Sequence, residues 1–131
     1  MNNCFILLAA GQSKRFKSSK HKQFISYKNM PLYEHSIIKA IESKLFRKII
    51  LVTNKKKIDL KKFKNKVKII KGGKERSDSS FLGIKYAKKL GAKNVFIHDA
   101  ARPNFSINLL KNISKSLKTN QAVVPFINSS D

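Results

Sequence analysis

The sequence predicts an α/β fold, a doubly wound and mostly parallel sheet of the Rossmann-like kind. Short apolar runs rich in Val, Ile and Leu alternate with longer segments of helical periodicity. The apolar runs are continuous, as expected for strands that are covered on both faces. Small or polar residues follow several of these runs, where such a sheet binds its ligand. The 131 residues are predicted to form one domain, residues 1–131, with its own core.

Eight segments are predicted to build this fold. The strands are Phe5–Ala10, Lys48–Thr53, Val67–Ile70, Asn94–His98 and Gln121–Pro125. The helices are Pro31–Leu45, with Pro31 in the first turn, Ser77–Leu90 and Ser106–Leu117. The basic segment Lys55–Lys64 is expected to be a short helix or a loop with one turn.

The ends and buried faces of two helices can also be predicted. Ser77 or Asp78 can cap the second helix, and Gly91 can end it. Its buried side is predicted to carry Phe81, Ile84, Ala87 or Lys88, and Leu90. The inner stripe of the third helix is predicted to be Leu110, Ile113 and Leu117.

The chain is strongly basic, with a net charge of +22 from 29 Lys and Arg against 7 Asp and Glu. Such a charge attracts polyanions, so a basic polyanion-binding module is one alternative. However, 25 of the cations are lysines spread along nearly the whole chain. Surfaces that recognise nucleic acid tend to cluster their charge and to use arginine. We therefore expect no specific nucleic-acid partner.

Cysteine usage and hydropathy suggest a compartment. The single cysteine, Cys4, excludes an intrachain disulfide and fits a reducing cytoplasm. The apolar run Cys4–Ala10 is too short for a signal peptide, and no run approaches the length of a membrane span. A cytoplasmic location without a membrane partner is expected.

The first strand leads into a loop suited to phosphate. Ala9, Ala10 and Gly11 have little or no side chain, so backbone N–H groups can approach phosphate oxygens there. Arg15 follows with a planar fork of donors, and Lys22 is among the lysines that supply mobile charges. The alternative is a strand followed by a lysine-rich surface loop.

Three polar segments follow predicted strands and should line one rim of the sheet: Ala9–Gln23, Gly72–Ser80 and Asp99–Pro103. Asp99 could hold Mg²⁺ against phosphate oxygens, because a carboxylate is a hard ligand. Alternatively, it caps the following turn or pairs with Arg102. His98 is expected to be a structural hydrogen-bonding residue.

The segment Gly72-Gly73-Lys74-Glu75-Arg76 leads to Ser79 at a helix start. Its glycines would let the backbone approach a base or a ribose. The alternative is an ordinary strand-to-helix turn. No Walker A or G-x-G-x-x-G pattern is present, so neither a P-loop NTPase nor a dinucleotide dehydrogenase is supported.

Together, LLAAGQSKRF…KHKQF, GGKERSDSSFLGI and VFIHDAARP resemble the 2-C-methyl-D-erythritol 4-phosphate cytidylyltransferase family of the non-mevalonate isoprenoid pathway. The resemblance implies a nucleotidyltransferase fold. It also implies transfer of a cytidylyl group from CTP to the methylerythritol phosphate, a sugar-alcohol phosphate, with release of pyrophosphate and with Mg²⁺ as cofactor.

The resemblance implies a role for each matching residue. Arg15 and Lys22 match the catalytic residues that stabilise the triphosphate and its transition state. Asp99 matches the magnesium-binding acid. Nucleotide-binding residues are implied at Ala9, Ala10 and Gly11 in the turn, at Gly73, Lys74 and Ser79 near the cytosine, and at Ala100 and Arg102.

The chain departs from the family at a few positions. Ser13 and His21 replace a glycine and a proline, and Lys74 stands where an acid is frequent. The family is expected to be homodimeric, but its dimer arm and acceptor site lie beyond Asp131, so the chain corresponds to the N-terminal part. Two alternatives share the same nucleotide half: a ribitol- or other sugar-phosphate cytidylyltransferase, and the N-terminal part of a fused isoprenoid enzyme.

Overall fold

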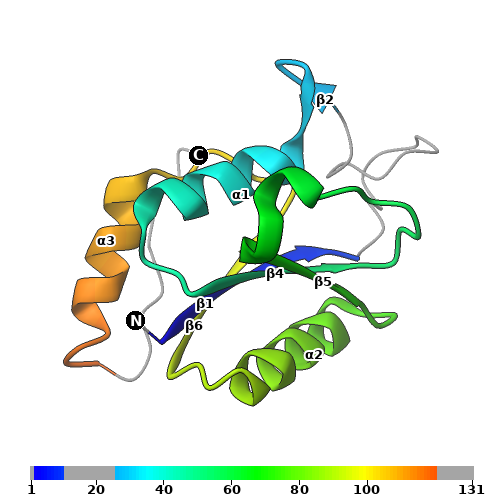
Figure 1. The fold of residues 1–131 in the computed structure, drawn as a ribbon. Helices are drawn as coiled ribbons and strands as arrows, with labels where there is room; N and C mark the ends of the chain where they lie inside the picture. Colours follow the sequence, from blue (N-terminus) through cyan, green and yellow to red (C-terminus); the bar gives the residue numbers. More distant parts are fainter. Residues whose placement is uncertain (1, 11–25, 121–131) are drawn as a thin grey trace, which may run out of the picture.

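The structure is a computed structural model that describes residues 2–10 and 26–120 (Figure 1). Its main sheet has four parallel strands in the order β5-β4-β1-β6. These strands are β1 (Asn3–Ala9), β4 (Lys48–Thr53), β5 (Val67–Lys71) and β6 (Asn94–Asp99). Four of the predicted strands are therefore confirmed. The fifth, Gln121–Pro125, lies outside the described residues.

The order of the strands reverses beside β1. The chain builds β4 and β5 on one side of β1 and then returns to place β6 on its other side. Such a reversal opens a crevice beyond the carboxyl ends of the two strands that flank it. In the registers, Leu8 pairs with Val52 and with Asp99, so the strands end at nearly the same level.

Helices cover both faces of the sheet (Figure 1). The helices α1 (Leu32–Ser43) and α3 (Ile107–Ser116) lie on one face, and α2 (Arg76–Lys89) lies on the other. All of β1 is buried, and its alternate side chains point to opposite faces. Phe5 and Leu7 pack toward α1 and α3, whereas Ile6 and Leu8 pack toward α2. The doubly wound parallel sheet is thus confirmed.

The face of α2 that packs on the sheet differs from the prediction. Ser79, Gly83 and Ala87 are buried, whereas Phe81 is 63% exposed and Ile84 is 39% exposed. The reason is close packing, because a Cβ on Gly83 would lie 2.7 Å from Ile6 Cγ2. Small side chains face the sheet here, and two of the predicted inner residues are therefore wrong.

The predicted ends of the helices need smaller corrections. Pro31 immediately precedes α1, which begins at Leu32. The N-cap of α2 is Glu75 rather than Ser77 or Asp78, because Asp78 at the third helical position completes a capping box with it. Gly91 follows the C-cap Leu90 with a φ of +86°, as a terminating glycine should. In α3, Leu110 is buried, and Ile113 and Leu117 pack against the core as predicted.

A small hairpin was not predicted. The strands β2 (Ser26–Tyr27) and β3 (Met30–Pro31) are antiparallel and have two residues each. Lys28 and Asn29 both have positive φ, at 51° and 65°, which matches a two-residue hairpin turn. Two-residue strands carry too few apolar positions to be recognised by periodicity.

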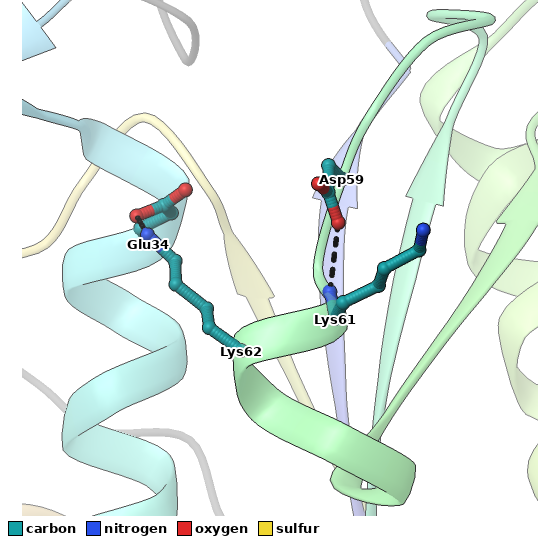
Figure 2. Close-up of polar contacts among 4 residues, drawn as sticks. All are labelled: Glu34, Asp59, Lys61 and Lys62. Atoms are coloured by element: carbon teal, nitrogen blue, oxygen red, sulfur yellow. Dashed lines mark hydrogen bonds and ion pairs between the residues drawn. The ribbon is translucent and has the colours of Figure 1, made fainter.

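The basic segment after β4 leads into a short 3₁₀ helix, η2 (Lys61–Lys66), which is kinked at Lys64 and is joined to α1 by an ion pair. Figure 2 shows Lys62 Nζ, which lies 2.6 Å from Glu34 Oε2, and Asp59 Oδ1, which accepts a hydrogen bond from Lys61 N. The Glu34 side chain is only 8% exposed, whereas that of Lys62 is 56% exposed. Lys62 therefore neutralises a buried carboxylate from the solvent side.

Lys62→Met is expected to destabilise the chain by about 1–3 kcal/mol, because the buried Glu34 carboxylate loses its partner. The double variant Glu34→Gln with Lys62→Met should recover part of that loss, because it leaves no buried charge. Urea unfolding of the three proteins measures these free energies. Equal stability of wild type and Lys62→Met would show that the ion pair contributes nothing.

Cys4 provides a probe of the core. It is 1% exposed in β1 and is a free cysteine. Burial raises the pKa of its thiol, and the charge of Arg47 and a backbone hydrogen bond with Lys48 oppose this only in part. The thiolate, which is the reactive form, is therefore suppressed in the folded chain.

Alkylation of Cys4 at pH 8 is expected to be at least about a hundredfold slower in the folded chain than in urea, because the reagent must wait for the core to open. The rates are measured by mass spectrometry with iodoacetamide. A model peptide of residues 1–10 serves as the control for intrinsic reactivity. A folded chain that reacts as fast as this peptide would contradict the buried position of β1.

Candidate functional site

The carboxyl ends of β1, β5 and β6 form one rim. Ala10 follows β1, Gly72 follows β5, and Asp99 ends β6. Ala10 and Gly72 touch so closely that a Cβ on Gly72 would lie 2.3 Å from Ala10 Cβ. The common rim is therefore confirmed for the described parts of the three predicted segments. Gly11, Arg15 and Lys22 lie outside the described residues, and their roles remain predictions.

The turn between β5 and α2 is built around a buried serine. Ser79 is 2% exposed, and its Oγ accepts a hydrogen bond of 3.1 Å from Gly73 N. A Cβ on Gly73 would lie 2.4 Å from Asp78 Cβ, so a larger residue cannot take this path without displacing α2. Lys74 is exposed beside these residues. The contacts are those of a tight strand-to-helix turn, and contact with a base by Gly73, Lys74 and Ser79 remains a prediction.

Asp99 uses its two carboxylate oxygens differently. Oδ1 accepts a hydrogen bond of 2.9 Å from Ala101 N, and Oδ2 lies 3.6 Å from Arg76 Nη1. Asp99 therefore caps the following turn, which was one of the two alternatives to a metal-binding role. The other alternative, an ion pair with Arg102, is wrong, because the partner of Asp99 is Arg76. The reason is geometric, because the first turn of α2 faces the end of β6 across the rim.

The residues around Asp99 are compatible with a bound magnesium ion. Mg²⁺ is commonly held by one or two carboxylates together with substrate phosphates and water. The Asp99 side chain is 38% exposed, and among the described residues Oδ2 contacts only Arg76, at 3.6 Å. In the described ranges, no group of three or more His, Cys, Asp or Glu could form a complete metal cage. A magnesium ion here would depend on Asp99 together with water and oxygens of a bound ligand.

The loop after β6 is tied to its surroundings. Ala100 is buried and its N–H donates to Leu8 O at 3.0 Å. His98 Nε2 donates to the carbonyl of Arg102, and the His98 ring lies 4.7 Å from the Phe105 ring. Burial lowers the pKa of His98, so the imidazole is neutral at neutral pH. His98 is thus the structural hydrogen-bonding residue that was predicted.

Two residues of this region were missed by sequence reasoning. Arg76 could have been singled out because it is one of only four arginines and lies in the segment after β5. Lys39 Nζ donates to the carbonyls of Pro103 and Phe105, the latter at 2.9 Å. Nothing in the sequence distinguishes Lys39 from the other lysines.

The sheet, its helices and its polar rim are those of a Rossmann-like nucleotidyltransferase. A family model described as 2-C-methyl-D-erythritol 4-phosphate cytidylyltransferase (IspD) matches residues 3–131, and the chain belongs to this family. None of the helices within 2–10 and 26–120 is long and apolar enough to cross a membrane.

Individual relatives agree with this assignment. The chain is 50% identical to the bifunctional enzyme IspD/IspF of Pelagibacter ubique, over 100% of this chain and 36% of the relative. It is 40% identical to a 2-C-methyl-D-erythritol 4-phosphate cytidylyltransferase of Clostridium botulinum, over 84% of this chain and 51% of the relative. The solved structure of the bifunctional IspDF from Campylobacter jejuni matches with a TM-score of 0.69 and 30% identity, over 89% of this chain and 31% of that one. The chain thus spans from about a third to about half of the length of these relatives.

Proposed function

We propose that this chain is the nucleotide-binding part of an enzyme that transfers a cytidylyl group from CTP to 2-C-methyl-D-erythritol 4-phosphate and releases pyrophosphate. The observation that carries the proposal is the match to the family over residues 3–131. The convergence of Ala10, Gly72 and Asp99 at one rim supports it, because ligands of doubly wound sheets bind at this edge.

In the proposed reaction, a phosphate oxygen of the acceptor attacks the α-phosphorus of CTP. The new P–O bond forms as the bond to the β-phosphate oxygen breaks, and pyrophosphate leaves with that electron pair. Such chemistry requires mainly positioning and charge stabilisation. We assign the charge stabilisation to Arg15 and Lys22, and contact with the nucleotide to the turn at Ala9, Ala10 and Gly11.

The remaining roles belong to the two other segments of the rim. We assign recognition of the cytosine to Gly73, Lys74 and Ser79, and contacts near the ribose and phosphates to Ala100 and Arg102. Asp99 would hold Mg²⁺, which supplies positive charge to the phosphate oxygens when it is bound. We place the reaction in the cytoplasm, where a free thiol such as Cys4 stays reduced.

The proposal is tested with the full-length protein, CTP, Mg²⁺ and a panel of acceptors. We expect pyrophosphate release with 2-C-methyl-D-erythritol 4-phosphate, and at most slow release with ribitol 5-phosphate. Faster turnover of ribitol 5-phosphate would favour the alternative sugar-phosphate cytidylyltransferase. Absence of release with every acceptor would contradict a cytidylyltransferase.

A fused enzyme is a second candidate, favoured by two similar proteins whose names describe them as bifunctional. It keeps the same nucleotide site and adds a further domain after the transferase. The reading frame beyond Asp131 decides between the two, because only a fusion must encode that additional domain.

A polyanion-binding module remains the alternative from another class, because of the net charge of +22. It predicts tight nucleic-acid binding that weakens steeply with salt. Filter binding of a random DNA duplex at about 50 and 200 mM salt tests this directly. We expect the DNA duplex to bind weakly and to be displaced by CTP with Mg²⁺.

A further inference from the structure

We propose that Lys39 is a positioning residue that holds the loop carrying Asp99 and Arg102 in the shape that binds the nucleotide. The inference rests on the proposed function. It concerns the segment from the end of β6 to the start of α3, which contributes Asp99, Ala100 and Arg102 to the proposed site.

The first observation is the position of the Lys39 ammonium group. Nζ donates to two backbone carbonyls of this loop, those of Pro103 and Phe105, and it also lies 5.2 Å from the centre of the Phe105 ring. Charged donors form stronger hydrogen bonds than neutral ones, and a cation is attracted to an aromatic face. Three contacts therefore fix one end of the loop to α1.

The direction of α1 explains why Lys39 can reach this loop. Residues of α1 that face the sheet include Tyr33, Ile37 and Ala40, and Lys39 is the neighbour of Ala40 at the margin of that face. Long side chains on a helix point back toward its N-terminus. Because α1 packs on the sheet beside α3, the Lys39 side chain extends across the start of the α3 layer.

Ion pairs among the described residues use their cations differently from Lys39. They join Lys62 to Glu34 and Arg76 to Asp99. Lys39 is directed instead at the carbonyl oxygens of Pro103 and Phe105. It is partly buried, as is Lys48, which donates to the carbonyl of Asn65, whereas most lysines of the chain are exposed. We therefore assign the charge of Lys39 to the hydrogen bonds that hold this loop.

The other contacts of the loop show which of its residues depend on Lys39. Asp99 is fixed by the strand and by its own turn, and Ala100 is bonded to β1. Arg102 lies further along, where its carbonyl accepts from His98 and the next residue, Pro103, is held by Lys39. Removal of the Lys39 charge should thus displace Arg102 more than Asp99. The expected consequence is weaker nucleotide binding with little change in the chemical step.

The test uses the full-length protein with four forms: wild type, Lys39→Met, Lys39→Arg and the control Lys111→Met. Lys111 is an exposed lysine of α3. For Lys39→Met we expect the KM for CTP to rise about tenfold while kcat stays within about twofold, because contacts equal in ground and transition states are lost. Lys39→Arg should restore most of the affinity, and Lys111→Met should match wild type.

Hydrogen exchange of residues 100–105 is measured on the same proteins without nucleotide. Lys39→Met should exchange faster in this segment only, with β1 unchanged. If Lys39→Met does not fold, Lys39→Gln replaces it, and a rise in KM of about threefold is expected because one donor group remains.

The outcomes separate this inference from the proposed function. A wild-type protein without CTP turnover would contradict the proposed function, and the exchange rates would still decide whether Lys39 holds the loop. With an active wild type, equal KM values for Lys39→Met and Lys111→Met would overturn the inference. A general loss of protection that Lys39→Arg does not restore would overturn it as well, because that pattern marks a purely structural residue.

Discussion

Arg15→Ala and Lys22→Ala are each expected to lower kcat of the full-length protein by about 10²–10³-fold, because each removes a preorganised donor to the developing phosphate charge. We expect the fold to persist, because the described core is built from β1 and from residues after the hairpin of β2 and β3. Steady-state pyrophosphate release measures the effect.

The chain provides a matched control for this prediction. Lys17 lies between the two residues in sequence, and we assign it to the general excess of lysine rather than to the site. Lys17→Ala carries the same charge change and should retain kcat within about threefold, because we assign Lys17 no contact with the triphosphate. If all three variants were equally active, the assignment of Arg15 and Lys22 would be wrong.

Gly72→Ala is expected to cause the largest structural disturbance at the rim. The added Cβ would lie 2.3 Å from Ala10 Cβ and 2.7 Å from Ser79 Oγ, and neither neighbour is the far end of a flexible side chain. The segments after β1 and β5 must therefore separate. We expect a loss of about 1–3 kcal/mol in stability from overpacking and a fall in CTP affinity of at least about tenfold.

Gly91→Ala separates stability from binding. A Cβ on Gly91 would meet no atom of the described residues within 4 Å, but the φ of this residue is +86°, so alanine there is strained without touching the described part of the rim. It should cost about 1 kcal/mol and leave CTP affinity unchanged. Urea unfolding and calorimetry of both variants make the comparison. An equal loss of affinity in the two variants would mean that the contact between Ala10 and Gly72 has no role in binding.

The strands of this protein could be predicted because they are short, continuous apolar runs. The predicted strand Lys48–Thr53 has the same bounds in the structure, whereas β1 begins two residues earlier and ends one residue earlier than predicted. The shared rim could also be predicted, because polar segments directly follow three of the strands and parallel strands end at the same edge of a sheet. These signals are local, and parallel sheets covered on both faces display them clearly.

The errors arise where packing depends on size or on distant partners. Periodicity predicts Phe81 on the buried face of α2, but Phe81 is exposed. The face that packs on the sheet carries Gly83 instead, because the space beside Ile6 is too small for a side chain at position 83. The contact of Lys39 with Phe105 joins residues far apart in the sequence, and the ion pair of Arg76 with Asp99 does the same. Before the fold is known, nothing singles out Lys39 among 25 lysines or Arg76 among four arginines as the cation that makes these contacts.

The central claim is that this rim binds CTP through Asp99 and Mg²⁺. The most direct measurement is calorimetry of the full-length protein with CTP, UTP, ATP and GTP, with and without Mg²⁺, for wild type and Asp99→Asn. Asparagine keeps an oxygen for the Ala101 N–H but loses the charge. We predict preferential, Mg²⁺-dependent binding of CTP by wild type and its loss in Asp99→Asn. Equal binding of all four nucleotides, or of CTP by both proteins, would contradict the claim.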